Sequence, residues 1–147
     1  SAVHEHIYRS NNFSTVQVQD YLQTLIENIR AGADPKIKVV EQLEDLSVDK
    51  DAATPLGLIL NEVVANAFKH AFPGGREGMV SVELMRRGDG QGQLTVADDG
   101  VGYDPETPAK GIGQRLIRAL TEQIGGTAEV ATGRGGSRFT LVFPLSR

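Results

Sequence analysis

The sequence predicts an α+β fold: a two-layer α/β sandwich in which about three helices cover one face of a mixed, mostly antiparallel sheet. Two observations lead to this class. Apolar residues recur at helical spacing through much of the first half, whereas apolar and polar residues alternate between glycine-rich turns after residue 73. Helices and strands also fail to alternate in the strict rhythm of a βαβ protein. The length of 147 residues fits about one domain.

The chain begins with helical patterns. Residues 1–10 have the pattern of the tail of a preceding helix. Ser14 or Thr15 is expected to cap the first complete helix, which continues to Gly32 on the strength of apolar residues at helical spacing. After a turn at residues 33–35, a short strand is predicted from Ile37, Val39 and Leu43.

A long helix follows. It begins at Asp49 or Asp51, carries Pro55 in its first turn, and ends near residue 71. Its second half places four polar side chains within about a third of the helix circumference: Glu62, Asn66, Lys69 and His70. A carboxylate, an amide, an ammonium and an imidazole on one partly apolar face suit a phosphate-bearing ligand. A polar face that simply meets water explains the same pattern, and this segment alone slightly favours that reading.

The next predicted elements form a hairpin, with strands around Val82 and Val96 and a turn at residues 88–92. The second strand leads directly into Asp98-Asp99-Gly100-Val101-Gly102. Glycine can adopt a positive φ, so this segment can turn sharply beneath a flat ligand. A carboxylate just before the turn can accept a hydrogen bond from an exocyclic amino group. Asp-Asp-Gly also occurs in ordinary turns, so the motif gains weight only beside the long helix.

A loop to Lys110 precedes the third helix, whose apolar stripe is Ile112, Leu116, Ile117 and Leu120. The helix opens with Lys110-Gly111-Ile112-Gly113, and the free N–H groups at such a start suit a phosphate. A dinucleotide-binding fingerprint does not fit, because Leu116 replaces the third glycine and no strand precedes the motif; no Walker-type loop occurs either. Two closing strands are predicted at about residues 127–132 and 137–143.

Composition excludes several classes of protein. The chain has no cysteine, so it holds neither a disulfide framework nor a zinc site built on sulfur. Its net charge of −4 argues against a nucleic-acid binder. No apolar run reaches the roughly 20 residues of a membrane-spanning helix, so no membrane insertion is expected. A start without methionine or signal segment leads us to expect a piece of a longer cytoplasmic protein.

Together these motifs resemble the ATP-binding domain shared by sensor histidine kinases, gyrase, Hsp90 and MutL, known as the Bergerat fold. Residues 61–70 resemble its N box, residues 98–102 its Asp-x-Gly-x-Gly box, residues 111–113 its second glycine box, and Gly135-Gly136-Ser137-Arg138-Phe139 its closing segment. The segment from Leu60 to Pro73 is similar to the histidine kinase branch with a HisKA_2 or HWE-like phosphoacceptor domain. Residues 3–10 resemble the end of that branch's dimerisation and phosphotransfer hairpin.

The resemblance implies a role for each matching residue. Asn66 would bind Mg²⁺, Lys69 would contact a phosphate with His70 nearby, and Glu62 would polarise or orient the attacking group. Asp98 would accept a hydrogen bond from the adenine amino group. Residues 103–112 would form a mobile lid over the ATP. The remaining ATP contacts implied are Gly100, Gly102, Lys110, Gly111, Ile112, Gly113 and Ser137.

The function implied is the ATP-binding catalytic domain of a bacterial, cytoplasmic two-component sensor histidine kinase. Residues 1–14 would end the helical hairpin and residues 15–147 would form the catalytic domain. It would bind ATP or ADP with Mg²⁺ and transfer the γ-phosphoryl group to a histidine outside this chain, since neither His4, His6 nor His70 is placed to accept it. Its partners would be the phosphoacceptor domain of the same protein, a response regulator, and a second copy in a full-length homodimer. Two alternatives stay open: an anti-sigma-factor-type serine/threonine kinase, and a non-catalytic nucleotide-sensing docking module.

Overall fold

The computed structural model describes residues 14–102 and 111–146, and the predicted lid falls mostly outside them. The described elements, in chain order, are β1 (Thr15–Gln17), α2 (Val18–Ala31), β2 (Ile37–Leu43), β3 (Ser47–Asp49), α3 (Lys50–His70), η1 (Pro73–Gly75), β4 (Gly78–Arg86), β5 (Gln91–Asp98), α4 (Gly111–Gln123), β6 (Thr127–Gly133) and β7 (Gly136–Pro144).

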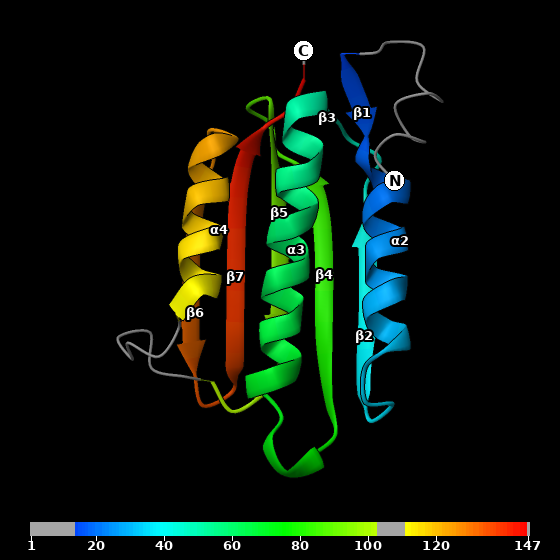
Figure 1. Ribbon diagram of the computed structural model, residues 1–147, viewed down its shortest axis with the longest axis vertical. Coiled ribbons are helices and arrows are strands. Elements are labelled where there is room, and N and C mark those ends of the chain that lie inside the picture. The colour runs from blue at the N-terminus through cyan, green and yellow to red at the C-terminus, as the bar shows by residue number, and fades with distance from the viewer. Residues whose placement is uncertain (1–13, 103–110, 147) are drawn as a thin grey trace.

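The main sheet has five strands in the order β2-β4-β5-β7-β6. The pair β2 and β4 is parallel, and the other three pairs are antiparallel. Helices α2, α3 and α4 all lie on the same face of this sheet, with α3 in the middle (Figure 1). The predicted α+β sandwich, with its mixed and mostly antiparallel sheet, is therefore confirmed.

The N-terminal end of the described chain differs from the prediction. Neither Ser14 nor Thr15 caps a helix: residues 15–17 form β1, which pairs antiparallel with β3, an element that the sequence analysis missed. Helix α2 begins only at Val18, after Gln17, whose side chain makes no capping hydrogen bond. Val16 and Val48, which face each other in this pair, are both fully buried. Pairing between distant segments thus overrides the local helix-start signal.

Helix α3 begins at Lys50, directly after β3 ends at Asp49, within the predicted range. Pro55 does not lie in the first turn, as expected, but is the sixth residue and is buried inside the helix. The start is set by the strand pairing, because the Lys50 N–H donates to the Ser14 carbonyl (3.0 Å). The proline removes one helical hydrogen bond, a cost that the packing of this buried helix has to offset.

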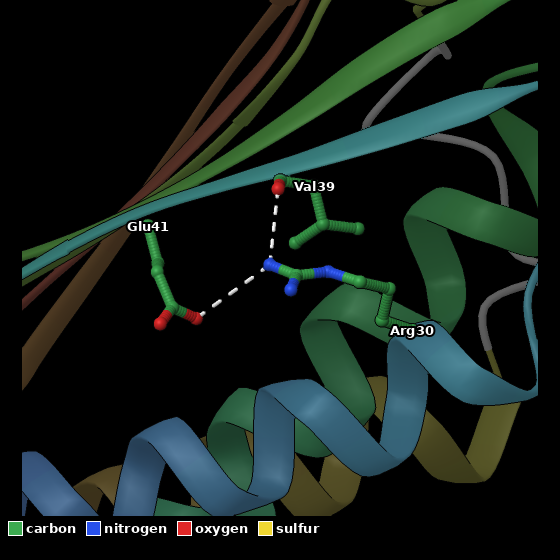
Figure 2. A network of polar contacts seen from close by, with 3 residues as sticks. All are labelled: Arg30, Val39 and Glu41. Carbon is green, nitrogen blue, oxygen red and sulfur yellow. Dashed lines mark hydrogen bonds and ion pairs between the residues drawn. The ribbon is translucent and has the colours of Figure 1, made fainter.

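Helix α2 packs over the edge strand β2, and two of its side chains donate hydrogen bonds to the β2 backbone. Arg30 donates a hydrogen bond to the Val39 carbonyl (3.1 Å) and lies 3.8 Å from the Glu41 carboxylate (Figure 2). Further along β2, the Gln19 side chain donates to the Leu43 carbonyl (2.7 Å). Because an edge strand presents backbone groups without a neighbouring strand, these contacts protect it from pairing with another chain.

The core lies between the helices and the sheet and holds large, fully buried side chains such as Leu22, Ile26, Leu56 and Phe143. Helices α2 and α3 approach closely at Gly57, where a side chain would collide with Tyr21 and Leu25. Within the described residues, no helix is both long and apolar enough to cross a bilayer.

Candidate functional site

The polar face of α3 points toward α4 and toward the end of β5. Asn66 is half-buried and His70 is exposed, and both line a cavity between α3, α4 and the sheet. Val64 is fully buried on the core side of the same helix, whereas Ala67 is buried and also lines the cavity. Lys69 is exposed and does not line the cavity. Residues one helical turn apart thus carry an amide and an imidazole into the same space.

Asp98 ends β5 and also lines this cavity. Its Oδ1 accepts a hydrogen bond from the Gly100 N–H (2.9 Å). Burial raises the pKa of the Asp98 carboxyl above its ordinary value; hydrogen bonds from the backbone of Gly100 and Ser137 lower it, and the nearby charge of Asp99 raises it further. A partly desolvated carboxylate at the end of a buried strand is a strong hydrogen-bond acceptor for a ligand amino group.

Asp99 has a structural use. Its Oδ1 accepts from the Met79 N–H (2.8 Å), and its carbonyl accepts from the Arg76 guanidinium (3.1 Å). The guanidinium also lies 5.9 Å from the centre of the Phe72 ring. Of the two adjacent acids, Asp99 therefore fixes the loop onto β4, which leaves Asp98 to face the cavity.

The glycines after Asp98 are required by close backbone contacts. A side chain at Gly100 would collide with the Ala71 backbone at the end of α3, to which the next residue, Val101, donates a hydrogen bond (2.9 Å). Gly102 has a φ of +74° and packs against the Gly133 carbonyl. The loop is thereby held between the end of α3 and the β6–β7 turn, and Gly102 lines the cavity.

Helix α4 begins at Gly111, so the predicted glycine pair lies at a helix N-terminus. The Glu62 carboxylate reaches this end: a side chain at Gly113 would meet Glu62 Oε1 and would stand 3.7 Å from Asn66 Nδ2. Glu62, Asn66 and Gly113 therefore form one cluster. Lys110 lies outside the described residues, and so do the surroundings of Gly111 and of the Ile112 side chain.

Ser137, near the start of β7, lines the cavity directly opposite Asp98 in the β5–β7 pair. Its hydroxyl shares a hydrogen bond of 2.9 Å with the Thr132 hydroxyl on β6. Gly136 makes this approach possible, because a side chain at this residue, which has a φ of +130°, would collide with the Asp98 carbonyl.

The cavity has a volume of about 380 Å³, within the usual range for small-molecule sites. The predicted site residues that line it are Asn66, His70, Asp98, Gly102 and Ser137. Glu62 and Gly113 lie beside it, because a side chain at Gly113 would meet the Glu62 carboxylate and stand 3.7 Å from Asn66 Nδ2. Gly100 acts through the backbone turn next to it.

Sequence reasoning missed the far wall of the cavity. That wall comes from α4 and β6, and its residues include Gln114, Ile117, Arg118, Thr121, Thr127, Ala128 and Val130. The sequence predicts Ile117 in one apolar stripe of this helix together with Leu116 and Leu120. Leu120 is buried as predicted, but Leu116 is 39% exposed and Ile117 faces the cavity. Helical spacing marks a face as apolar and does not distinguish a core from a ligand cavity.

Comparison with known proteins identifies the class to which this fold and cavity belong. Residues 51–147 match the family of histidine kinase-, DNA gyrase B- and HSP90-like ATPases, and residues 1–33 match a histidine kinase family, HisKA_2. The chain therefore belongs to the histidine kinase-, DNA gyrase B- and HSP90-like ATPase family, as an ATP-binding catalytic domain of the histidine kinase type.

Individual relatives support this family assignment. The chain is 33% identical over 114 residues to blue-light-activated histidine kinase 2 of Erythrobacter litoralis, which covers 76% of this chain and 33% of that protein. Its structure is similar to the histidine kinase domain of the E. litoralis EL346 blue-light-activated kinase, with a TM-score of 0.87, 26% identity, and coverage of 98% and 74% of the two chains. The mycobacterial sensor histidine kinase MprB shares the fold, with a TM-score of 0.73, 23% identity, and coverage of 89% and 96%. The chain spans about a third of the length of the first of these relatives.

Proposed function

We propose that this chain is the part of a bacterial sensor histidine kinase that binds Mg²⁺-ATP and presents its γ-phosphoryl group to a histidine on a separate helical domain. The observation that carries this proposal is that α3, β5 and β7 bring Asn66, Asp98 and Ser137 to the same cavity. Glu62 and the N-terminus of α4 lie beside that cavity. Asp98, an acid suited to recognise a base, and the N-terminus of α4, which is suited to bind phosphate, thus lie at one site, as a nucleotide requires.

In this proposal the adenine base lies at Asp98, whose carboxylate accepts from the amino group. Gly102 turns the chain beneath the base, and Ser137 contacts the same edge. The phosphates extend toward Asn66 and the N-terminus of α4, where the N–H groups of Gly111–Gly113 stabilise negative charge. Lys69 is exposed and does not line the cavity, so we propose that it contacts a phosphate through its long, flexible side chain.

The residues present fit a magnesium ion held mainly by the nucleotide. Among the described residues, no cluster of three or more His, Cys, Asp or Glu side chains could hold a metal by itself. Mg²⁺ commonly takes one or two protein ligands and completes its octahedron with phosphate oxygens and water. The Asn66 amide, beside Gly113 and facing the cavity, is the group we assign to it. When bound, the ion would neutralise charge on the transferring phosphoryl group.

Glu62 is the proposed catalytic residue. Its carboxylate lies against Gly113, at the end of the site where the terminal phosphate would be held. From there it can accept a hydrogen bond from the attacking imidazole and orient it in line with the phosphoryl group. The protein thus contributes position and charge, and the acceptor arrives from another domain.

The proposal extends to the whole protein. The HisKA_2 match at residues 1–33 favours a histidine acceptor over the serine or threonine acceptor of the alternative kinase. We propose that the full-length protein is a homodimer that passes the phosphoryl group to a response regulator. We propose that the activity is cytoplasmic, because its proposed substrate is ATP.

Nucleotide titration tests the assignment of the base site. ATP is expected to bind the 147-residue chain about ten- to a hundredfold more tightly than GTP. Guanine would present a carbonyl oxygen to Asp98, so two acceptors would face each other. Calorimetric titration with both nucleotides in Mg²⁺ measures the difference. Equal affinities would rule out Asp98 as the base-recognising group.

A further inference from the structure

One row of residues crosses three strands beside the proposed base site. Thr132 on β6 faces Ser137 on β7, and Ser137 faces Asp98 on β5. Asp98 and Ser137 line the cavity, whereas Thr132 does not and is half-buried behind Ser137. The hydroxyl oxygens of Thr132 and Ser137 are 2.9 Å apart and share a hydrogen bond that either can donate.

Thr132 is well suited to hold the Ser137 hydroxyl in one orientation. A serine hydroxyl can occupy three staggered rotamers, whereas the β-branched threonine is restricted at χ1. The strand pairing of β6 and β7 fixes the backbones of both residues. Thr132 also packs against the turn after Asp98, because its Oγ1 lies 3.1 Å from the position that a side chain at Gly102 would take. Thr132 therefore lies next to both Ser137 and Gly102, the two residues that the proposed function places at the adenine base.

We propose that Thr132 is a positioning residue for adenine recognition: its hydroxyl holds that of Ser137, the residue opposite Asp98, in one orientation. This inference rests on the proposed function, in which Asp98 and Ser137 face the amino edge of the base. Thr132 itself does not touch the nucleotide. Its contribution is to remove the rotamers in which the Ser137 hydroxyl turns away from the ligand.

The test is a double-mutant cycle measured by ATP titration of the 147-residue chain. Thr132→Val keeps the size and branching of the side chain and removes its hydroxyl. It is expected to lower ATP affinity about three- to tenfold, from the loss of one hydrogen bond and the return of about three rotamers. Thr132→Ser keeps the hydroxyl and should retain most of the affinity. In a Ser137→Ala background, Thr132→Val should have a much smaller effect, because the hydroxyl that Thr132 positions is gone.

Thr140→Val, the same substitution on the neighbouring strand β7 and outside the cavity lining, is the control and should leave ATP affinity unchanged. If the unsubstituted chain binds ATP tightly and the Thr132→Val variant binds it equally well, the assignment of Thr132 is wrong and the proposed function stands. An equal loss in the Ser137→Ala background would also overturn it, since Thr132 would then act on the fold. If the unsubstituted chain does not bind ATP, the proposed function fails and this inference with it. Should Thr132→Val not fold, Thr132→Ala enters the same cycle with the same expected results.

Discussion

The proposed role of Asp98 couples base recognition by a single residue to pH. In that role its ionised carboxylate accepts from the adenine amino group more strongly than a neutral carboxyl would, and burial raises its pKa above the ordinary value. ATP affinity should therefore fall on acidification at a higher pH than a fully exposed aspartate would give. Asp98→Asn, which does not titrate, supplies the baseline for protonation of ATP itself. Titration calorimetry from pH 7 downward should show the two affinity curves converging; parallel curves would contradict this role.

The same pKa shift makes a prediction about stability. A carboxyl whose pKa is raised by folding binds its proton more tightly in the folded state, so its favourable contribution is present at low pH and is lost as pH rises through the folded-state pKa. Asp98→Asn should thus leave the Tm at pH 7 equal or higher. Its advantage over the unsubstituted chain should shrink on acidification. Thermal unfolding at several pH values measures this, and a clear loss of Tm at pH 7 would give Asp98 a structural role instead.

Asn66 provides the matching test for the metal. Asn66→Ala should weaken ATP binding mainly in the presence of Mg²⁺, because the amide is assigned to the ion and not to the base. Asp98→Asn should weaken binding with or without the ion. Titrations in Mg²⁺ and in EDTA separate the two effects. An Asn66→Ala defect of equal size in both buffers would contradict the ligand role, and an unfolded Asn66→Ala protein would favour the view that the polar face of α3 is structural.

At the scale of elements, the sequence predicts what depends on local pattern and misses what depends on distant pairing. The amphipathic α3 and the alternating strands β4 and β5 are predicted because their periodicity is set by the face they bury. The pairing of β1 with β3 is missed, because three-residue strands carry too little pattern and Thr15 resembles a cap. In the site, Asn66, Asp98 and Ser137 are found from motifs, whereas Ile117 and Thr121 are not, since spacing cannot tell a cavity wall from a core.

The α2–α3 crossing gives a prediction about packing. Gly57 is buried, and a side chain there would stand 2.9 Å from Leu25 Cδ1 and collide with the Tyr21 hydroxyl. Gly57→Val should therefore destabilise the fold by about 1–3 kcal/mol through overpacking. Gly88→Val, in a turn where nothing lies within 4 Å, is the control and should cost much less. Denaturant unfolding measures the free energy of unfolding of both variants. Equal losses for Gly57→Val and Gly88→Val would show that α2 and α3 move apart to make room for the side chain.

At the scale of the whole molecule, the architecture separates binding from transfer. The cavity and the α4 N-terminus can hold a nucleotide, whereas the histidine that receives its phosphoryl group is proposed to lie outside this chain. His70 lines the cavity itself, and His4 and His6 lie outside the described residues. Because in-line alignment of the acceptor accounts for much of the rate of such a reaction, the chain alone should bind ATP and transfer almost nothing.

Substitution of Glu62 tests the proposed transfer step separately from ATP binding. When the acceptor hairpin of the full-length protein is supplied, Glu62→Ala should lower the transfer rate on the order of 10²-fold, as expected for loss of a group that orients or polarises the nucleophile. ATP affinity should change little, because Glu62 contacts the α4 N-terminus and not the base site. Single-turnover rates and ATP titrations on the same variant separate these effects. A parallel loss of affinity would make Glu62 a binding residue.

The most direct test of the account is a transfer experiment with γ-labelled ATP, run on the 147-residue chain with and without the acceptor hairpin as a separate polypeptide. The account predicts that the chain alone stays unlabelled. With the hairpin present, label should appear on the hairpin in the acid-labile, alkali-stable form of a phosphohistidine. Label of that form on the chain alone would contradict the separation of binding from transfer, and acid-stable label on serine or threonine would replace the histidine kinase with the serine/threonine kinase alternative.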